Sequence, residues 1–372
     1  FADAQVLAKK MVTTFTLSSE QLSSQCHYDY GMRAVKSTIE MCGKLKRELG
    51  DSYQEDQITL RALRDVNVPK FLKDDLPLFE NIITDLFPTT ERGKVEYGNL
   101  MPTLTQVGKA QNLQLTENFV TKVVQLIDTI GVRHGLMLVG PTGGGKTSNY
   151  RLLQQTSTEL HHEGDAKYQK VQTHILNPKS ITQAQLYGAF DEVTREWSDG
   201  VAAECVRTAV ASGKSGCPDN HWVIFDGPVD ALWIESMNTV LDDNKKLCLN
   251  SGEIIKLSTV TTMLFEVRDL DYASPATVSR VGVVFLEPNT DLGWTPMLQS
   301  WMLTLEPYIK EAHGEQIKAL FMGNFPVLLE AVSKVKTPFP VSNGWLCSMA
   351  CRLLEALIND KVECYCKPTV EV

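Results

Sequence analysis

The sequence predicts an α/β fold, in which a mostly parallel sheet carries helices on both faces and helical segments flank it. Residues 140–147 form a glycine-rich motif between an apolar run typical of a buried strand and a stretch without glycine or proline that suits a helix. Further short apolar runs alternate with helical patterns downstream, which is the order that parallel sheets produce. Helical patterns also dominate the first and the last part of the chain.

The glycine-rich motif satisfies the complete pattern G-x-x-x-x-G-K-[ST] of phosphate-binding loops. Its residues are Gly140, Pro141, Thr142, Gly143, Gly144, Gly145, Lys146 and Thr147. Glycine lets the backbone curl so that successive N–H groups point at phosphate oxygens, while the lysine reaches the β and γ phosphates and the last hydroxyl ligates Mg²⁺. The motif therefore predicts binding of ATP or ADP with Mg²⁺, and its completeness disfavours a chance glycine turn.

The other elements define the expected organisation. Residues 1–88 are mostly helical in pattern, and the polar, breaker-rich segment that follows marks a boundary. After it we expect a helix capped by Thr116, largely helical structure over 183–211 and five strands. The strands are expected at 135–139, 171–176, 222–226, 261–267 and 282–286. The predicted domains are a helical domain at 1–88, a linker at 89–109, an α/β core at 110–290 and a second helical domain at 291–372.

The composition is that of an ordinary globular chain, because 43% of the 372 residues are hydrophobic and 22% are charged. A net charge of −9 argues against nucleic acid as a partner. No apolar stretch reaches the roughly 18 residues of a membrane span, so no membrane partner is expected. The chain begins without methionine or a signal-peptide pattern, and we interpret it as a piece of a longer protein. The 9 cysteines are irregularly spaced, which favours reduced thiols over a disulfide framework.

A phosphate loop needs a second acid to help hold Mg²⁺, and Asp226, at the end of an apolar run, is the candidate. The next residue is Gly227, whereas ATPases of this type usually place a glutamate there to polarise the attacking water. Asp230 and Glu235 follow further along the chain, too far for direct substitution. The sequence therefore predicts a site that binds nucleotide and hydrolyses it slowly or not at all.

Two arginines stand apart from the motif. Arg280 precedes the expected strand at 282–286, where it can project from the edge of the module and neutralise phosphate charge in a neighbouring site. The alternative is a surface ion pair, which the local sequence alone favours. Arg33 lies in the N-terminal helical region without a nearby motif, so a solvated or salt-bridged arginine is the preferred interpretation from the residues.

Several segments together resemble the motor ring of dynein heavy chains, most closely the axonemal type of cilia and flagella. The resemblance rests on the phosphate loop and on residues 17–25, 27–36, 60–65, 74–79, 186–188, 196–200, 238–245 and 273–280. These segments occur in the same order and cover nearly the whole chain. Dynein heavy chains carry several AAA+ modules in one chain, so the resemblance implies an AAA+ P-loop NTPase core flanked by helical lid domains.

The resemblance implies a role for each domain. Residues 1–88 would be the helical C-terminal (lid) part of the first AAA+ module, 110–290 the α/β core of the second module, and 291–372 part of its helical lid. The first module is the main ATPase, and the second binds nucleotide without cycling, which agrees with Gly227. Arg33 would be the lid arginine that touches the first module's nucleotide, and Arg280 the arginine finger that enters the same site.

The resemblance also implies partners, a location and one further site residue. The partners would be other AAA+ modules of the same heavy chain, dynein light and intermediate chains, and microtubules contacted by regions outside this segment. The location would be the cytoplasm, the cytoskeleton and the axoneme of a cilium or flagellum, where the motor is minus-end-directed. AAA+ modules usually place a polar sensor at the end of the fourth strand, and Glu266 is the candidate for it here.

Two other functions remain as alternatives to the motor segment. A free-standing P-loop enzyme such as a nucleotide kinase would need an acceptor pocket with its own base, and Gly227 counts against it. A structural ring segment with a vestigial site is the other alternative, against which the intact Lys146 and Thr147 count. Measurements of nucleotide binding and of turnover distinguish the three.

Overall fold

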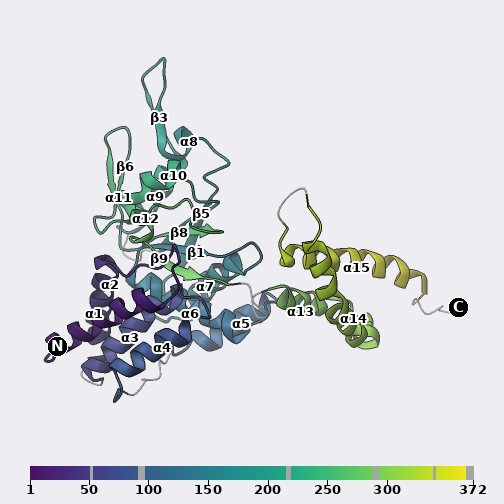
Figure 1. Ribbon diagram of the computed structural model, residues 1–372. Helices are drawn as coiled ribbons and strands as arrows, with labels where there is room; N and C mark the ends of the chain where they lie inside the picture. Colours follow the sequence, from purple (N-terminus) through teal and green to yellow (C-terminus); the bar gives the residue numbers. More distant parts are fainter. Residues whose placement is uncertain (51–52, 91–96, 215–218, 288–292, 338–340, 366–372) are drawn as a thin grey trace. The chain divides into compact units, whose positions relative to one another are not determined.

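A computed structural model describes residues 1–50, 53–90, 97–214, 219–287, 293–337 and 341–365 (Figure 1). The chain divides into two compact units. The first comprises Phe1–Leu104, Thr121–Gly140 and Lys146–Leu286, and the second comprises Thr105–Val120, Pro141–Gly145 and Glu287–Val372. Helices α5 (Leu100–Ala110) and α6 (Glu117–Val132) contribute residues to both units. The Thr116 hydroxyl accepts a hydrogen bond from the Phe119 amide at 3.3 Å, which confirms the predicted cap of α6.

The centre of the first unit is a parallel sheet of five strands in the order β2-β5-β8-β1-β9. All five predicted strands are present, so the predicted α/β class with a parallel sheet is confirmed. The central strand β8 is almost wholly buried, as a parallel strand covered on both faces must be. The bounds are β1 (Gly135–Val139), β2 (Val171–Leu176), β5 (Asn220–Asp226), β8 (Thr261–Val267) and β9 (Gly282–Phe285).

Two small hairpins extend the first unit beyond the predicted elements. Residues 183–211 were expected to be largely helical, and this expectation was wrong in its middle third. Helix α8 (Gln183–Tyr187) ends at Gly188, the hairpin of β3 (Gly188–Phe190) and β4 (Trp197–Asp199) follows, and only then does α9 (Val201–Ser212) begin. Strands this short show too little alternation of apolar and polar residues to be distinguished from a helical pattern. The rings of Phe190 and Trp197, with centroids 5.1 Å apart, hold the two strands together. The second hairpin consists of β6 (Lys246–Cys248) and β7 (Ile254–Lys256).

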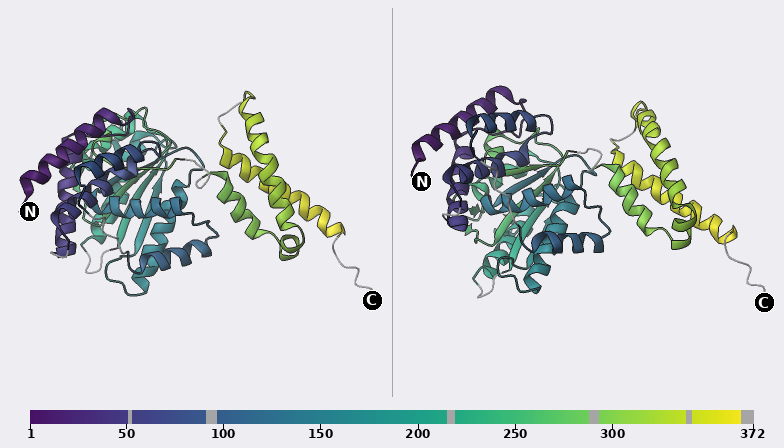
Figure 2. Two further views of the ribbon diagram at one scale, coloured as in Figure 1. Left: turned by 60° about the horizontal axis from the view of Figure 1, so that its bottom comes forward. Right: turned by 90° about the horizontal axis from the view of Figure 1, so that it is seen from below.

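The N-terminal helices pack together beside the β9 edge of the sheet (Figure 2). They share one apolar core, and the 3-10 turn η2 reaches β9. His27 is buried and stacks on Phe285 of β9, with ring centroids 4.9 Å apart. The helical pattern predicted for residues 1–88 is thus observed and lies against the core. The elements are α1 (Ala4–Gln21), α2 (Met32–Leu49), α3 (Glu55–Asn67), η2 (Val68–Lys70) and α4 (Leu76–Leu86).

Stacked aromatic side chains fill the interior between the sheet and its helices. Phe225 of β5 stacks on Phe265 of β8 at 5.2 Å and on Trp233 at 5.7 Å. This packing fixes β5 next to β8, and with them the polar residues at the ends of both strands. The remaining helices of the first unit are α7 (Lys146–His162), α10 (Ala231–Ile234), η3 (Glu235–Met237), α11 (Asn238–Leu241) and α12 (Pro275–Val278).

The second unit is helical in its C-terminal part, as the sequence pattern predicts for the residues after 291. Its helices are α13 (Trp294–Thr304), α14 (Pro307–Ser333) and α15 (Asn343–Tyr365), drawn in green to yellow in Figure 2. Cys347 and Cys351 are buried in its core with Leu298, Phe321 and Phe325. The six cysteines whose side chains the structure describes are free.

Candidate functional site

The phosphate loop follows β1 directly and ends where α7 begins, as the motif requires. Its backbone has positive φ at Gly140 (157°), Gly143 (85°) and Gly145 (84°). At Gly140 a Cβ would also lie 2.3 Å from the Leu286 carbonyl oxygen, so that only glycine fits. The Gly144 amide donates to the Pro141 carbonyl at 3.2 Å, which closes a turn within the loop. The loop therefore has the curled backbone that allows N–H groups to converge on an anion.

Lys146 and Thr147, the first residues of α7, carry the polar groups of the motif. The buried Lys146 ammonium donates to the Gly140 carbonyl at 2.6 Å. Burial lowers its pKa, while the carboxylates of Glu266 and Asp226 act in the opposite direction. The Thr147 hydroxyl donates to Oε1 of Glu266 at 2.6 Å. Lys146 and Thr147 at the start of α7 thus lie beside an acid, Glu266, that comes from β8.

The two acids, Asp226 and Glu266, lie side by side at the carboxyl end of the sheet. The register of β5 and β8 pairs their Cα atoms, and the Gly227 amide donates to the Glu266 carbonyl at 3.3 Å. Burial raises the pKa of the Glu266 carboxyl and the charge of Asp226 adds to this, while the hydrogen bond from Thr147 opposes it. The second oxygen of Glu266, Oε2, is buried and has no hydrogen-bond partner among the described residues. Hydroxyl and carboxylate oxygens are the ligands that Mg²⁺ prefers, so these groups fit the metal of a nucleotide complex.

Gly227 occupies the position where a catalytic glutamate is expected, and the side chains nearest to it are those of Pro178 and Asn177. A Cβ at Gly227 would lie 3.2 Å from Pro178 and 3.3 Å from the side-chain oxygen of Asn177. Asp230 is engaged elsewhere, because it forms an ion pair with Lys179 and accepts from the Leu232 amide at 2.9 Å. Asn177 was not among the predicted site residues. Its position directly after β2 was the signal that could have pointed to it.

The structure brings Arg33 and Arg280 together from distant parts of the chain. Arg33 contacts Ser279, the residue before Arg280, across a sequence separation of 246. Both guanidinium groups approach the same oxygen, Oδ1 of Asp242, at 3.5 Å from Arg33 and 3.3 Å from Arg280. Arg33 also donates to the Ser279 hydroxyl at 3.0 Å, and Arg133 donates to the carbonyls of both arginines. The side chains of Arg33 and Arg280 remain 43% and 19% exposed, so solvent-borne anions can reach them.

The arginine pair lies at the opposite end of the sheet from the phosphate loop. All five strands are parallel, and Arg280 precedes β9, whereas Gly140 and Asp226 stand at the carboxyl ends of β1 and β5. A strand of five residues spans about 16 Å, beyond the reach of one side chain. The sequence pointed to both arginines but not to Asp242, the carboxylate that they share. The sequence signal that points to Asp242 is its place in the segment 238–245, one of those that carry the resemblance.

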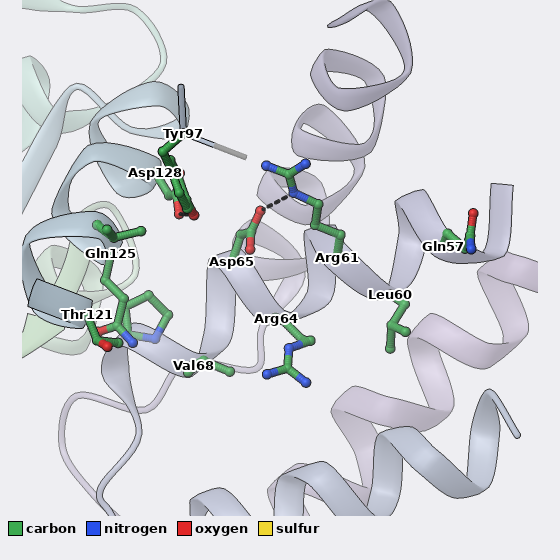
Figure 3. A pocket seen from close by; sticks show the side chains of 12 residues that line it. Gln57, Leu60, Arg61, Arg64, Asp65, Val68, Tyr97, Thr121, Gln125 and Asp128 are labelled. Atoms are coloured by element: carbon green, nitrogen blue, oxygen red, sulfur yellow. Dashed lines mark hydrogen bonds and ion pairs between the residues drawn. The ribbon is translucent and has the colours of Figure 1, made fainter. Parts of the chain in front are cut away.

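A separate cavity of about 330 Å³ lies between α3 and α6 in the first unit (Figure 3). Arg61 pairs with Asp65 at 3.4 Å, and the Tyr97 hydroxyl donates to Asp128 at 3.1 Å. Burial raises the pKa of Asp65 to about 7, and burial also raises the pKa of Asp128. None of the predicted site residues lines this cavity, so it is distinct from the phosphate loop.

A parallel sheet with helices on both faces, with a complete phosphate loop after β1 and an acid at the end of β5, defines an AAA+ type P-loop module. Residues 1–147 match the family described as the hydrolytic ATP binding site of the dynein motor region, and residues 135–281 match the AAA domain of the dynein-related subfamily. Domains of this kind imply nucleotide binding. The chain belongs to the dynein heavy-chain family.

Curated relatives support this placement over nearly the whole chain. Human dynein axonemal heavy chain 1 is 50% identical over 371 residues, which is 99% of this chain and 8% of that protein. Human dynein axonemal heavy chain 6 is 49% identical over 364 residues, 97% of this chain and 9% of the relative. The rat dynein axonemal heavy chain 1 is 54% identical over 326 residues, 87% of this chain and 7% of the relative. The chain thus spans less than a tenth of the length of these relatives.

Proposed function

We propose that this chain is part of the ring of an ATP-driven, minus-end-directed microtubule motor and contains one nucleotide-holding AAA+ module. The module binds Mg-ATP or Mg-ADP with little or no hydrolysis and presents Arg280, together with Arg33, to the nucleotide of a neighbouring module. The observation that carries this proposal is the position of the two arginines at the opposite end of the sheet from the chain's own loop. The two arginines cannot reach a nucleotide in that loop, and their partly exposed side chains are free to contact a nucleotide bound by a neighbouring module.

The proposed nucleotide contacts follow from the loop and from the carboxyl ends of the strands. The backbone of Gly140, Gly143 and Gly145 would hold the phosphates, with Lys146 on the β and γ phosphates. Thr147 and Asp226 would hold Mg²⁺, which neutralises phosphate charge when bound. The other loop residues, Pro141, Thr142 and Gly144, complete the cradle. Weak hydrolysis follows from Gly227, because glycine has no group that accepts a proton from water.

The proposed partners derive from the relatives and from the arginine pair. Residues 1–88 would belong to the lid of the first module, 89–109 to a linker, 110–290 to the core of the second module and 291–372 to its lid. Other modules of the same heavy chain, light and intermediate chains and, through other regions, microtubules would be the partners. The relatives are named axonemal, and we propose the same location, the axoneme and the cytoskeleton, for this chain. Among the described residues no helix is long and apolar enough to cross a membrane.

Calorimetric titration of the chain with Mg-ATP and Mg-ADP, with phosphate release followed in parallel, tests the nucleotide part. We expect binding that depends on Lys146 and phosphate release near background. Fast turnover that depends on Lys146 would instead favour the alternative of a free-standing P-loop enzyme such as a nucleotide kinase, and no observation in the structure favours that alternative. The arginine part is tested in a longer heavy chain that includes the preceding module.

A further inference from the structure

The carboxylate of Glu266 lies in surroundings that leave one of its oxygens without a partner. Oε1 accepts the hydrogen bond from the Thr147 hydroxyl at 2.6 Å, whereas Oε2 is buried and unpartnered among the described residues. A buried acceptor without a donor is costly, and native structures retain one mainly where a ligand or ion completes it. Asp226, the neighbour in the strand register, adds a second negative group at the same place.

The distance between the Thr147 and Glu266 oxygens fits two neighbouring ligands of one magnesium ion. Octahedral Mg²⁺ holds its ligands at 2.0–2.1 Å, which places adjacent ligand oxygens about 2.9 Å apart. The observed separation of 2.6 Å is close to this value. Because Thr147 is the residue of the motif that ligates Mg²⁺, an oxygen this near to its hydroxyl lies within reach of the same ion.

We propose that Glu266 contributes a carboxylate oxygen to the Mg²⁺ of the bound nucleotide, beside Thr147 and Asp226, and thereby makes nucleotide retention strongly dependent on Mg²⁺. This inference rests on the proposed nucleotide-binding function and deepens it. An ionised carboxylate only accepts hydrogen bonds and repels phosphate, so without a cation it weakens nucleotide binding. With Mg²⁺ in place the same charge strengthens it.

The experiment compares nucleotide affinity with and without the metal in the chain and in two variants. ADP and ATP are titrated into wild type, Glu266→Gln and Glu235→Gln, each in Mg²⁺ and in EDTA. Glutamine at position 266 keeps the shape of the side chain and can still accept the hydrogen bond from the Thr147 hydroxyl. Glu235→Gln is the control, because Glu235 is an exposed glutamate beyond β5. We expect Glu266→Gln to bind nucleotide in EDTA as tightly as wild type or more tightly, and to lose about tenfold of the enhancement by Mg²⁺. Glu235→Gln should keep the full enhancement.

The outcomes separate this inference from the proposed function. If wild type binds nucleotide through Lys146 and Glu266→Gln keeps the full Mg²⁺ enhancement, Glu266 is not a metal ligand and only this inference fails. If wild type shows no binding that depends on Lys146, the proposed function and the inference fail together. A uniform loss of affinity in both buffers would assign Glu266 a structural role, which also overturns the inference.

Two further readouts do not depend on nucleotide affinity. The electron paramagnetic resonance spectrum of Mn²⁺-ADP bound to the chain should change in Glu266→Gln and stay the same in Glu235→Gln, because only the first variant alters the proposed ligands. In buffer without metal or nucleotide, Glu266→Gln should melt at the same or a higher temperature, since a buried unpartnered carboxylate is removed. An unchanged Mn²⁺ spectrum would contradict direct ligation.

Discussion

The two ends of the central sheet differ in how their polar groups are assembled. At the carboxyl ends of the strands, the loop residues follow one another in sequence, and Asp226 and Glu266 join them from two adjacent strands. At the other end, Arg33 and Arg280 come from distant parts of the chain and meet at Asp242. The first region is a local motif completed by its sheet, whereas the second exists only because the N-terminal helices pack beside β9.

The surroundings of the charged groups differ in the same way. Lys146 is buried and contacts its own loop, which suits a group that holds a ligand inside the module. The two arginines are partly exposed and are oriented by a carboxylate that a stronger anion can replace. This difference supports the proposal that one region retains nucleotide while the other acts on a neighbour's nucleotide.

Arg280→Ala should reduce the ATPase rate of a heavy chain that contains the preceding module by about a thousandfold, as for arginine fingers in general. Nucleotide affinity at this chain's own loop should change by less than about twofold, because the strands separate the two regions. Steady-state phosphate release and ADP titration measure the two effects. Arg268→Ala, an exposed arginine just after β8, is the matched control. An equally large loss of nucleotide affinity at this chain's own phosphate loop would contradict the separation of the two regions.

Lys146→Ala should weaken Mg-ATP binding to this chain about a hundredfold, because it removes the charge that reaches the β and γ phosphates. Calorimetry of the chain measures the change, and Lys246→Ala, at an exposed position of β6, serves as the control. Binding that survives the Lys146 substitution would place the nucleotide away from this loop.

The packing of the N-terminal helices against β9 should be weakened by acid, because His27 stacks on Phe285 there. Burial lowers the pKa of His27 to about 4 from its ordinary 6.5, so the unfolded chain binds the proton more readily than the folded one. Stability is therefore fully present above pH 6.5 and is lost as the pH falls towards 4. Between pH 7 and pH 5 the free energy of unfolding should fall by about 2 kcal/mol from this group alone.

Urea titrations at both pH values measure this effect, with His27→Phe as the comparison. Phenylalanine retains a ring to stack on Phe285 but cannot take up a proton. The variant should show a drop smaller by about 2 kcal/mol than that of wild type. Equal drops in the two proteins would show that other groups govern the acid sensitivity.

Asp242→Asn should have the smallest effect, a decrease of about threefold in the neighbour's ATPase rate, because partly exposed ion pairs contribute about 1 kcal/mol or less. The substitution loosens both arginines at once without removing either. Asp243→Asn is the control, because it disturbs the ion pair with Lys36 and keeps the ion pairs of Arg33 and Arg280 with Asp242. An increase in rate would mean that Asp242 competes with the nucleotide for the arginines.

Much of the fold and of the loop site could be predicted because the signals are local. Buried parallel strands appear as continuous apolar runs, and the sequence locates all five of them. The short hairpins could not be located in this way, since strands of three residues carry too little alternation to distinguish from helix. Glu266 was proposed from its position near the end of β8, but its contact with Thr147 depends on how β8 lies beside the loop.

The phosphate loop, the order of strands along the chain and the presence of glycine instead of glutamate at position 227 can all be read from the sequence, because each depends on residue types at fixed spacing. In contrast, the fold has to be known to see that Arg33 and Arg280 share Asp242, and that they lie at the opposite end of the sheet from the loop. The reason is physical. Strand order and the packing of helices against a sheet edge bring together residues that are far apart in sequence, and no local pattern encodes such distances.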